Sequence, residues 1–466
     1  MGMKKSINRI TLINILSTVL LQGISFISAP IFSRLMGTAN YGVFSLFQTW
    51  TSVITTVFSL QTVATVSVAP AYFKEEEQPG YQSSVLFLSI ASYAVLALLS
   101  LLLLTPLSML TKMAKPACIL MLVLGFAQMC ISFANAKFTI EFRADNNLKL
   151  SLSSTLLGVA LSLVLFRFIS ASDNYYARML GITIPEFCIA VGLCWSIFKN
   201  GRKTVQLDYW KFCLPIALPC IFHSLSGLVL NQSDRIMIQR ILGESQVGIY
   251  SLAFAFGNIT HIIYLSLNNS WIPFYFEDLR EQNIDGLHKR ARNYTELFTV
   301  LSVGFVLLSP EVYRIFASEE YWEGGSFVAL FVLSSFFTFL YSFPVNYEAY
   351  CKNSKVMAMT TMFAALLNIG LNLLFIRLFG TIGAVIATVI SHFLQFALHH
   401  ICARYWIKQH VYPFKIQLFL PYILCLGAVI ASCYAVGNNF AWIRWGLGAV
   451  VGAVELYRIV KRKTIF

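Results

Sequence analysis

Ionisable residues stand inside long apolar runs of this sequence, where charged side chains are rare. Asp234 and Arg235 are adjacent in one run, and Glu186 follows Pro185 in another. Burying a charge in hydrocarbon is costly, so such residues commonly bind substrate, carry protons or pair with each other. Asp234 and Arg235 are candidates for substrate contact or for a structural charge pair. Glu186 is the candidate for proton coupling or gating, or alternatively for a hydrogen bond to a neighbouring helix.

A polar phrase that occurs twice supplies two more cations. "RLMGTANYGVFS", Arg34–Ser45, returns as "RILGESQVGIYS", Arg240–Ser251, with the arginine, both glycines and the serine in the same places. The first glycine of each phrase suits the end of a helix, where a positive φ costs glycine nothing. Arg34 and Arg240 are candidates to face a ligand. The alternative is that each side chain extends to the lipid headgroups.

The composition indicates that these residues belong to a membrane protein. Of 466 residues, 57% are hydrophobic and only 12% are charged, against about 25% charged in soluble proteins. About 20 apolar residues are needed to cross a bilayer core of about 30 Å, and this chain offers one such run after another. A large soluble domain is therefore excluded. The net charge of +13 concerns loop orientation rather than nucleic acid.

The apolar runs predict an all-α integral membrane protein with about 14 transmembrane helices. Lys and Arg concentrate in alternate loops, which predicts that both termini are cytoplasmic. The predicted spans are 10–32, 42–68, 84–106, 116–136, 150–170, 177–198, 212–238, 247–273, 294–310, 325–346, 356–376, 381–402, 415–435 and 441–457.

The repeated phrase divides these helices into two matched sets. It joins the first predicted helix to the second and the seventh to the eighth, and a further pair, "PAYFKEEE" from Pro70 and "PFYFEDLR" from Pro273, continues the match. We therefore expect two pseudo-symmetric six-helix lobes, 1–205 and 206–403, related by an axis along the membrane normal. Residues 404–466 supply two helices outside the duplication.

Several of these motifs resemble a known family. The twin phrase, "DRIMI" at Asp234–Ile238 and "NIGLNLLFIRLFGTIGAVIATVIS" at Asn368–Ser391 are similar to polysaccharide-transport flippases of the multidrug/oligosaccharidyl-lipid/polysaccharide superfamily. The resemblance implies two lobes around a central cavity in a bacterial inner membrane. It also implies alternating-access transfer of an undecaprenyl-diphosphate-linked oligosaccharide to the outer leaflet, for a surface polysaccharide such as O-antigen of lipopolysaccharide or capsule. By the same resemblance, the last two helices form a groove for the polyprenyl tail, although plain lipid contact fits them equally well.

Such a cargo requires cations for phosphates and amide or aromatic groups for sugars. The candidates are Arg34, Arg235 and Arg240, with Asp234 beside them, and a second set elsewhere. Glu141 and Arg143 lie between two helices where a cytoplasm-facing cavity would open, with a solvated loop as the alternative. Asn268, Asn269 and Trp271 lie near a helix end and suit sugars, with interhelical hydrogen bonding and interfacial anchoring as alternatives.

Two other functions remain open from the sequence. A drug or cation antiporter of the same superfamily would usually keep an acidic residue in an N-lobe helix, and the first five helices show no convincing one. Lipid II flippases usually carry arginines in helix 1, where Ile24 and Ser28 stand here. A membrane polymerase or glycosyltransferase would need a larger outer loop, and no DxD, HExxH or GxxxxGK[ST] motif occurs.

We therefore predict a transporter that is not an enzyme, without catalytic residues, metal site or cofactor. The ten cysteines form no CxxC or Cys/His cluster. The expected partners are the lipid-linked oligosaccharide, membrane lipids, an H⁺ or Na⁺ gradient, and a polysaccharide polymerase with its chain-length regulator. Nucleic acid is not expected as a partner.

Overall fold

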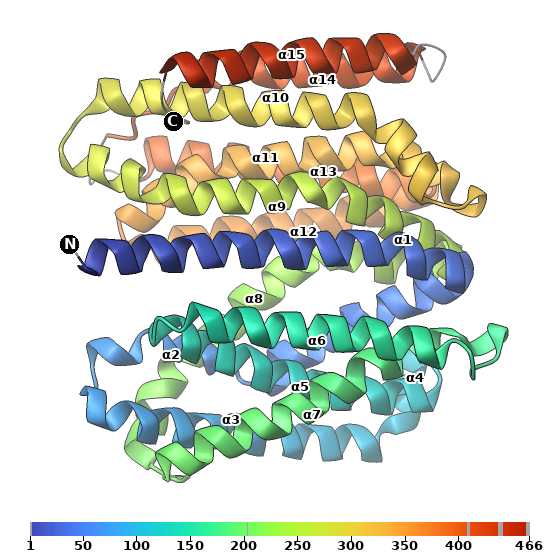
Figure 1. The fold of residues 1–466 in the computed structure, drawn as a ribbon, viewed down its shortest axis with the longest axis vertical. Helices are drawn as coiled ribbons and strands as arrows, with labels where there is room; N and C mark the ends of the chain where they lie inside the picture. The colour runs from blue at the N-terminus through green and yellow to red at the C-terminus, as the bar shows by residue number, and fades with distance from the viewer. Residues whose placement is uncertain (1, 203, 408–410, 437–440, 463–466) are drawn as a thin grey trace. The chain divides into compact units, whose positions relative to one another are not determined.

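The chain is helical throughout the part that the structure describes. This computed structural model describes residues 2–202, 204–407, 411–436 and 441–462, in which α-helices and short 3₁₀ turns occur and no β-strand (Figure 1). The earlier helices are α1 (Gly2–Phe58), α2 (Val63–Val66), α3 (Gln78–Leu102), α4 (Leu104–Thr111), α5 (Lys115–Ile140), α6 (Ala144–Leu165), α7 (Tyr175–Gly201) and α8 (Leu207–Leu242). The later ones are α9 (Glu244–Arg280), α10 (Ile284–Phe316), α11 (Gly325–Tyr350), α12 (Ser354–Phe379), α13 (Thr381–Tyr405), α14 (Leu420–Val436) and α15 (Ala441–Arg462).

The prediction of an all-α, multi-pass membrane protein is confirmed. Within the described residues, ten helices are long and apolar enough to cross a bilayer, and a pair bent by 60° after Phe58 would make eleven. Every predicted span overlaps a helix: the first lies within α1, and the second, 42–68, runs from α1 across the break at Ser59–Thr62 into α2. The ninth span, predicted at 294–310, belongs to the longer helix α10, Ile284–Phe316. Its polar first turns carry no apolar signal and were missed for that reason.

The chain separates into two compact units, residues 1–235 and 236–466, which are described here each by itself. The predicted lobe boundary at 205/206 falls in the short connection between α7 and α8, whereas the two units divide within α8. Residues 404–466, predicted as a separate part, belong to unit 2. The two-lobe division at 205/206 stays a prediction.

The glycines of the repeated phrase adopt the predicted backbone. Gly37 has φ 71° and interrupts α1, and Gly243 has φ 95° between α8 and α9. A third turn of this kind, at Gly380 with φ 69°, joins α12 to α13. Side chains with a Cβ rarely adopt such φ values, so glycine at these turns lets consecutive helices reverse direction without strain.

Unit 1 is held together by close helix contacts and one aromatic cluster. A Cβ on Gly125 of α5 would lie 2.4 Å from the Tyr93 hydroxyl and 3.1 Å from Thr55 Oγ1, so α3, α5 and α1 approach closely there. Near the α7–α8 connection, the rings of Phe73, Tyr81 and Tyr209 pack within 4.9–5.5 Å of one another. Small residues and ring contacts fix the helices of this unit around its interior.

Unit 2 has a denser aromatic core. Trp271 of α9 is fully buried against Tyr294 of α10 and Phe343 of α11, at ring separations of 5.0 and 5.9 Å. At Gly383 of α13 a Cβ would lie 2.0 Å from the Phe375 carbonyl of α12, so the two helices approach closely there.

Polar contacts add to this core. Asn368 of α12 bonds to the next helix, because its Nδ2 donates to Ser391 Oγ of α13 at 3.2 Å. One hydrogen-bonded pair of ionisable side chains in unit 2 is entirely enclosed: Glu348 Oε2 lies 2.8 Å from His399 Nδ1, and both side chains have no exposed surface.

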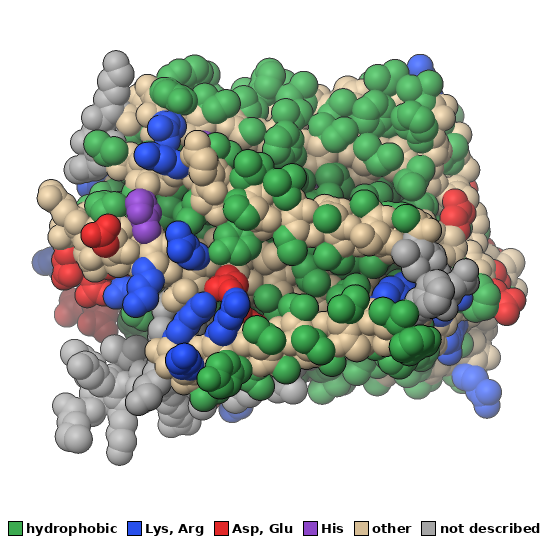
Figure 2. All heavy atoms as spheres, turned by 90° about the horizontal axis from the view of Figure 1, so that it is seen from above, with side chains coloured by type: hydrophobic (Ala, Val, Ile, Leu, Met, Phe, Trp, Pro, Cys, Tyr) green, Lys and Arg blue, Asp and Glu red, His purple; other side chains and the backbone are tan. Residues whose placement is uncertain are grey.

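The face of the molecule that α15 covers is largely hydrophobic. Figure 2 shows apolar side chains across it, with charged side chains gathered toward the two ends. On α15 itself, exposed apolar residues include Leu447, Val450 and Val454. A band of apolar surface between two charged edges is the expected form of a lipid-facing surface.

Candidate functional site

A polar cavity of about 360 Å³ lies inside unit 1. Its walls come from α1, the connection to α2, α5, α6 and α7. Hydroxyl and amide side chains dominate the lining, with one carboxylate among them: Ser52, Thr55, Thr56, Ser59, Gln61, Thr62, Gln128, Ser132, Ser154 and Glu186. A cavity so rich in hydrogen-bonding groups holds water or a polar ligand rather than lipid.

A membrane-spanning helix breaks beside this cavity, and non-helical backbone therefore forms part of the cavity wall. After Phe58 the helix axis turns by 60°, and Leu60 and Gln61 adopt left-handed φ values of 54° and 51°. Each such residue costs on the order of 1–3 kcal/mol, and such strain clusters at functional sites. Non-helical backbone at membrane depth is tolerated only where protein encloses it or where it lines an aqueous cavity. The cavity therefore explains how this break is tolerated at membrane depth.

Side chains of the break satisfy part of its freed backbone. The backbone N–H of Gln61 donates to Ser59 Oγ at 3.2 Å. The hydroxyls of Thr62 and Ser89 share a hydrogen bond between the break and α3. The break was not predicted: Ser59–Thr62 contains neither glycine nor proline, and the sequence favours a continuous helix from 42 to 68. Its only sequence signal is the run of hydroxyl and amide residues from Thr55 to Thr65.

Glu186 lies at the wall of this cavity opposite the break. It is half-buried, follows Pro185 within α7, and receives a hydrogen bond from the side chain of Gln128 on α5. Among the described residues that line the cavity, it is the one ionisable side chain of the Asp, Glu, Lys and Arg classes. Of the residues singled out in the sequence, Glu186 alone lies in this cavity.

Arg178 is an intramembrane cation that was not predicted from the sequence. It precedes Glu186 by eight residues on α7, about 12 Å along the axis. Its Nη1 donates to Ser162 Oγ at 3.0 Å, and its guanidinium lies 3.9 Å from the ring centre of Phe32. The rule that drew attention to Glu186, a charge inside an apolar run, would also have found Arg178. It was overlooked because it stands next to residue 177, where the predicted span begins.

The candidates near the α5–α6 connection form local ion pairs. Glu141 Oε2 lies 3.4 Å from Arg143 Nε, and Glu141 Oε1 lies 3.8 Å from Lys137 Nζ one turn earlier. The side chain of Arg143 is 60% exposed. Contacts of this kind fit the solvated loop that was the alternative interpretation.

The other charged candidates lie on α1 and α8. Arg34 is exposed on α1, three residues before the turn at Gly37. Asp234 and Arg235 are both buried on α8, whereas Arg240 is exposed near its end. The roles of these four residues toward a substrate stay predictions.

The candidates on α9 are divided between core and surface. Trp271 is enclosed by aromatic rings, and Asn268 is buried, accepting from Asn346 Nδ2 of α11 at 3.2 Å. Asn269 is exposed. In this conformation Trp271 and Asn268 hold α9 to its neighbours. Their sequence position did not reveal this, because α9 continues to Arg280 and places both residues well inside the helix.

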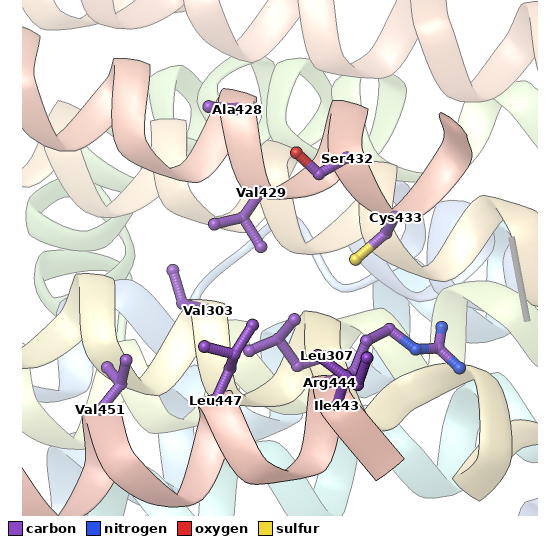
Figure 3. A pocket seen from close by; sticks show the side chains of 10 residues that line it. All are labelled: Val303, Leu307, Ala428, Val429, Ser432, Cys433, Ile443, Arg444, Leu447 and Val451. Carbon is purple, nitrogen blue, oxygen red and sulfur yellow. The ribbon is translucent and has the colours of Figure 1, made fainter. Parts of the chain in front are cut away.

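An apolar groove of about 580 Å³ runs between α10, α14 and α15 in unit 2. Figure 3 shows Val303 and Leu307 of α10 between Val429 of α14 and Leu447 of α15, with the guanidinium of Arg444 at one end. Arg444 forms an ion pair with Glu311 of α10. The groove matches the expectation that the last two helices contact a lipid chain.

Residues 8–277 match the family described as "Polysaccharide biosynthesis protein". An uncharacterized membrane protein of Haemophilus influenzae is 24% identical over 230 residues, which is 47% of this chain and 56% of that protein. The probable low-salt glycan biosynthesis flippase Agl15 of Haloferax volcanii is 22% identical over 81% of this chain and 79% of its own. Among solved structures, the lipid II flippase MurJ in an inward closed conformation has a TM-score of 0.68. It is 18% identical and covers 94% of this chain and 99% of its own. This chain therefore shares the fold of that solved structure.

Proposed function

The chain belongs to the polysaccharide biosynthesis protein family, and from that membership we propose that it flips an undecaprenyl-diphosphate-linked oligosaccharide across a bacterial inner membrane. It is a multi-pass membrane transporter and not an enzyme. The proposed direction is from the cytoplasmic to the outer leaflet by alternating access, with both termini in the cytoplasm. The product serves a surface polysaccharide of the O-antigen or capsule type.

The observation that carries the mechanism is the polar cavity of unit 1. A flippase has to change conformation in response to an energy source, and a carboxylate in a cavity of hydroxyls can bind and release a cation or a proton. Glu186 is that carboxylate, and the side chain of Gln128 holds it in place from α5. We propose that Glu186 binds a proton from the gradient that drives the cycle.

The broken helix supplies the conformational partner of this event. When Glu186 is charged, the hydroxyls of Ser59 and Thr62 and water in the cavity solvate it from the side of the break. When Glu186 is neutral, this solvation is worth less, and the two walls of the cavity can move against each other. Leu60 and Gln61, with their strained φ values, are the place where α1 can change its bend.

The cargo is recognised by different residues from those that bind the proton. Cations suit the diphosphate, and the exposed Arg34, Arg143 and Arg240 are the proposed contacts, together with the buried pair Asp234 and Arg235. Asn269 is the exposed amide proposed for sugar hydroxyls. Asn268 and Trp271 would contact a sugar only in a conformation in which α9 separates from its neighbours.

The proposal is tested in cells that lack the protein. Deletion of the gene is expected to accumulate undecaprenyl-diphosphate oligosaccharide on the cytoplasmic face and to abolish one surface glycan. The accumulated lipid is identified by mass spectrometry and its leaflet by accessibility to a glycosidase. Normal display of every surface glycan would contradict the proposal.

A drug or cation antiporter is the second candidate, and the cavity itself favours it, because a carboxylate in the first unit also suits exchange of a proton for a cationic drug. The two functions separate in one pair of assays. An antiporter would lower the sensitivity of cells to cationic dyes and would leave the lipid-linked oligosaccharides of the deletion strain unchanged.

A further inference from the structure

A second cavity of unit 2 meets the apolar groove at Arg444. This cavity of about 420 Å³, here called the Arg314 pocket, is bounded by α10, α11, α14 and α15 and is lined by Arg314, Trp322 and Glu323 among others. Cys433 and Arg444 line both the Arg314 pocket and the groove. A polar compartment and an apolar compartment thus adjoin on the surface of one unit.

The surrounding residues place the Arg314 pocket at the depth of lipid headgroups. Trp322, Trp442, Trp445 and Tyr434 are all exposed at this end of the unit, and exposed tryptophan and tyrosine concentrate at membrane–water interfaces. From Arg444 the groove runs along α15 past Val451, about 10 Å further at 1.5 Å per residue. The groove therefore extends from the interface toward the hydrocarbon.

The Arg314 pocket is lined by three charged side chains, Arg314, Glu323 and Arg444, and Arg314 and Glu323 do not pair with each other. Neither Arg314 nor Glu323 has an ion-pair partner within 4.0 Å among the residues that the structure describes. The Arg314 guanidinium instead lies 5.4 Å from the ring centre of Trp322. Arg444 is paired with Glu311, which also accepts from Trp445 Nε1 at 3.2 Å. The two unpaired charges are thus available to a ligand that carries both signs.

We propose that the Arg314 pocket and the apolar groove together bind one membrane phospholipid with a phosphoethanolamine headgroup. The phosphate accepts from Arg314, the ammonium donates to Glu323, and the hydroxyl of Ser326 lies in the same pocket. The acyl chains enter the groove beside Val303 and Leu447.

The charges of the pocket select among lipids. A phosphocholine headgroup has no N–H to give to Glu323, and a phosphoglycerol headgroup leaves that carboxylate without a cation. The small size of the pocket suits such a headgroup better than an oligosaccharide. This lipid is therefore distinct from the proposed cargo, and the inference does not depend on the proposed function.

The test measures lipid binding to the full chain purified in detergent. Native mass spectrometry is used to titrate the protein with phosphatidylethanolamine, phosphatidylcholine and phosphatidylglycerol that carry identical acyl chains. Phosphatidylethanolamine is expected to bind about tenfold more tightly than the other two, since one charge-assisted hydrogen bond distinguishes them. Arg314→Gln and Glu323→Gln should each remove this preference.

Two matched variants control for charge. Arg377→Gln and Glu320→Gln remove the same charges from exposed positions outside both cavity linings, and they should keep the preference. Thermal unfolding of all four variants confirms that they are folded. Val451→Trp fills the groove and should weaken long-chain phosphatidylethanolamine without changing the binding of a short-chain form.

Several results would overturn the inference. Equal binding of the three lipids, a preference for phosphatidylglycerol, or an unchanged preference in Arg314→Gln and Glu323→Gln would each contradict a phosphoethanolamine site. Displacement of phosphatidylethanolamine by an equimolar amount of undecaprenyl phosphate would assign the groove to the carrier lipid instead. The flippase assay plays no part in these outcomes, so failure here leaves the proposed function standing.

Discussion

The same shift of 206 positions that relates Arg34 to Arg240 relates two side-chain pairs in the two units. In unit 1, Gln128 of α5 donates to Glu186 of α7. In unit 2, the residues at the shifted positions are Ser334 of α11 and His392 of α13, which also share a hydrogen bond. Each unit thus contains a hydrogen-bonded pair of polar side chains between two of its helices, and the pair in unit 1 includes a carboxylate.

The helices beside these pairs differ as well. In unit 1 the helix breaks at Ser59–Thr62, whereas α9 runs unbroken from Glu244 to Arg280 through the shifted positions 265–268. Ser334 and His392 are both buried, and the ring of Phe393 packs 5.2 Å from that of Phe337 nearby. One unit has a polar cavity beside a broken helix, and the other packs aromatic rings around continuous helices. The two units therefore differ in their polar chemistry, although the repeated phrase predicts that their helices match.

The largest expected effect distinguishes the two matched pairs. Glu186→Gln should reduce pH-driven transport in proteoliposomes by at least about a hundredfold, because the variant has no group that binds and releases the proton. His392→Gln should leave most of the transport in place. Rates are measured with an imposed pH gradient, and Glu76→Gln serves as a control at an exposed position outside the cavity. Unchanged transport in Glu186→Gln would remove the coupling role and make the two units alike.

The next effect concerns the ionisable groups of unit 2. We expect these groups to stabilise the fold rather than to carry protons during transport. His399→Ala should lower the free energy of unfolding by about 3 kcal/mol, since it leaves the enclosed Glu348 without its partner. The measurement is denaturant unfolding in detergent micelles. The pH profile of transport should keep its shape. A shifted profile would show that unit 2 also takes part in proton binding.

A smaller and equal effect is expected where the units are alike. Gly37→Ala and Gly243→Ala should each destabilise the protein by about 1–2 kcal/mol, because both turns have positive φ. Melting temperatures of the two variants, compared with Gly227→Ala as a helical glycine with open space around it, check this. A loss at only one of the two turns would mean that their matching geometry differs in energy.

The smallest effect has opposite signs in the two matched helices. At Leu60, where φ is 54°, glycine should be more stable than alanine by about 1 kcal/mol. At Leu265, inside the continuous helix α9, alanine should be more stable than glycine by about the same amount. The four variants are compared by thermal unfolding. If alanine were more stable than glycine at both positions, the chain around Leu60 would be helical in the membrane rather than broken.

Much of the fold follows from apolar spans and glycines. The helices and the positive φ at Gly37 and Gly243 could be predicted because each depends on local chemistry. Glu186 was found because a buried carboxylate is conspicuous in an apolar run. These features need no knowledge of which helices are neighbours.

The rest depends on tertiary packing. The break at Ser59–Thr62 is stabilised by contacts with other helices, such as that of Thr62 with Ser89, and the residues themselves permit a helix. Trp271 looked like an interfacial residue because the extension of α9 beyond 273 is polar. Local pattern does not reveal whether an aromatic side chain meets lipid, ligand or another ring.

The broken helix also has a consequence for isotope exchange. At the break, the amides of Leu60, Thr62 and Thr65 bond to carbonyls only three residues earlier, with N···O distances from 3.0 to 3.4 Å. Thr62 lines the polar cavity, so water in the cavity lies next to the break at membrane depth. We expect these amides to take up deuterium well before those of α9 at comparable depth. A peptide that covers residues 58–66 would then report each opening of the cavity without any attached label.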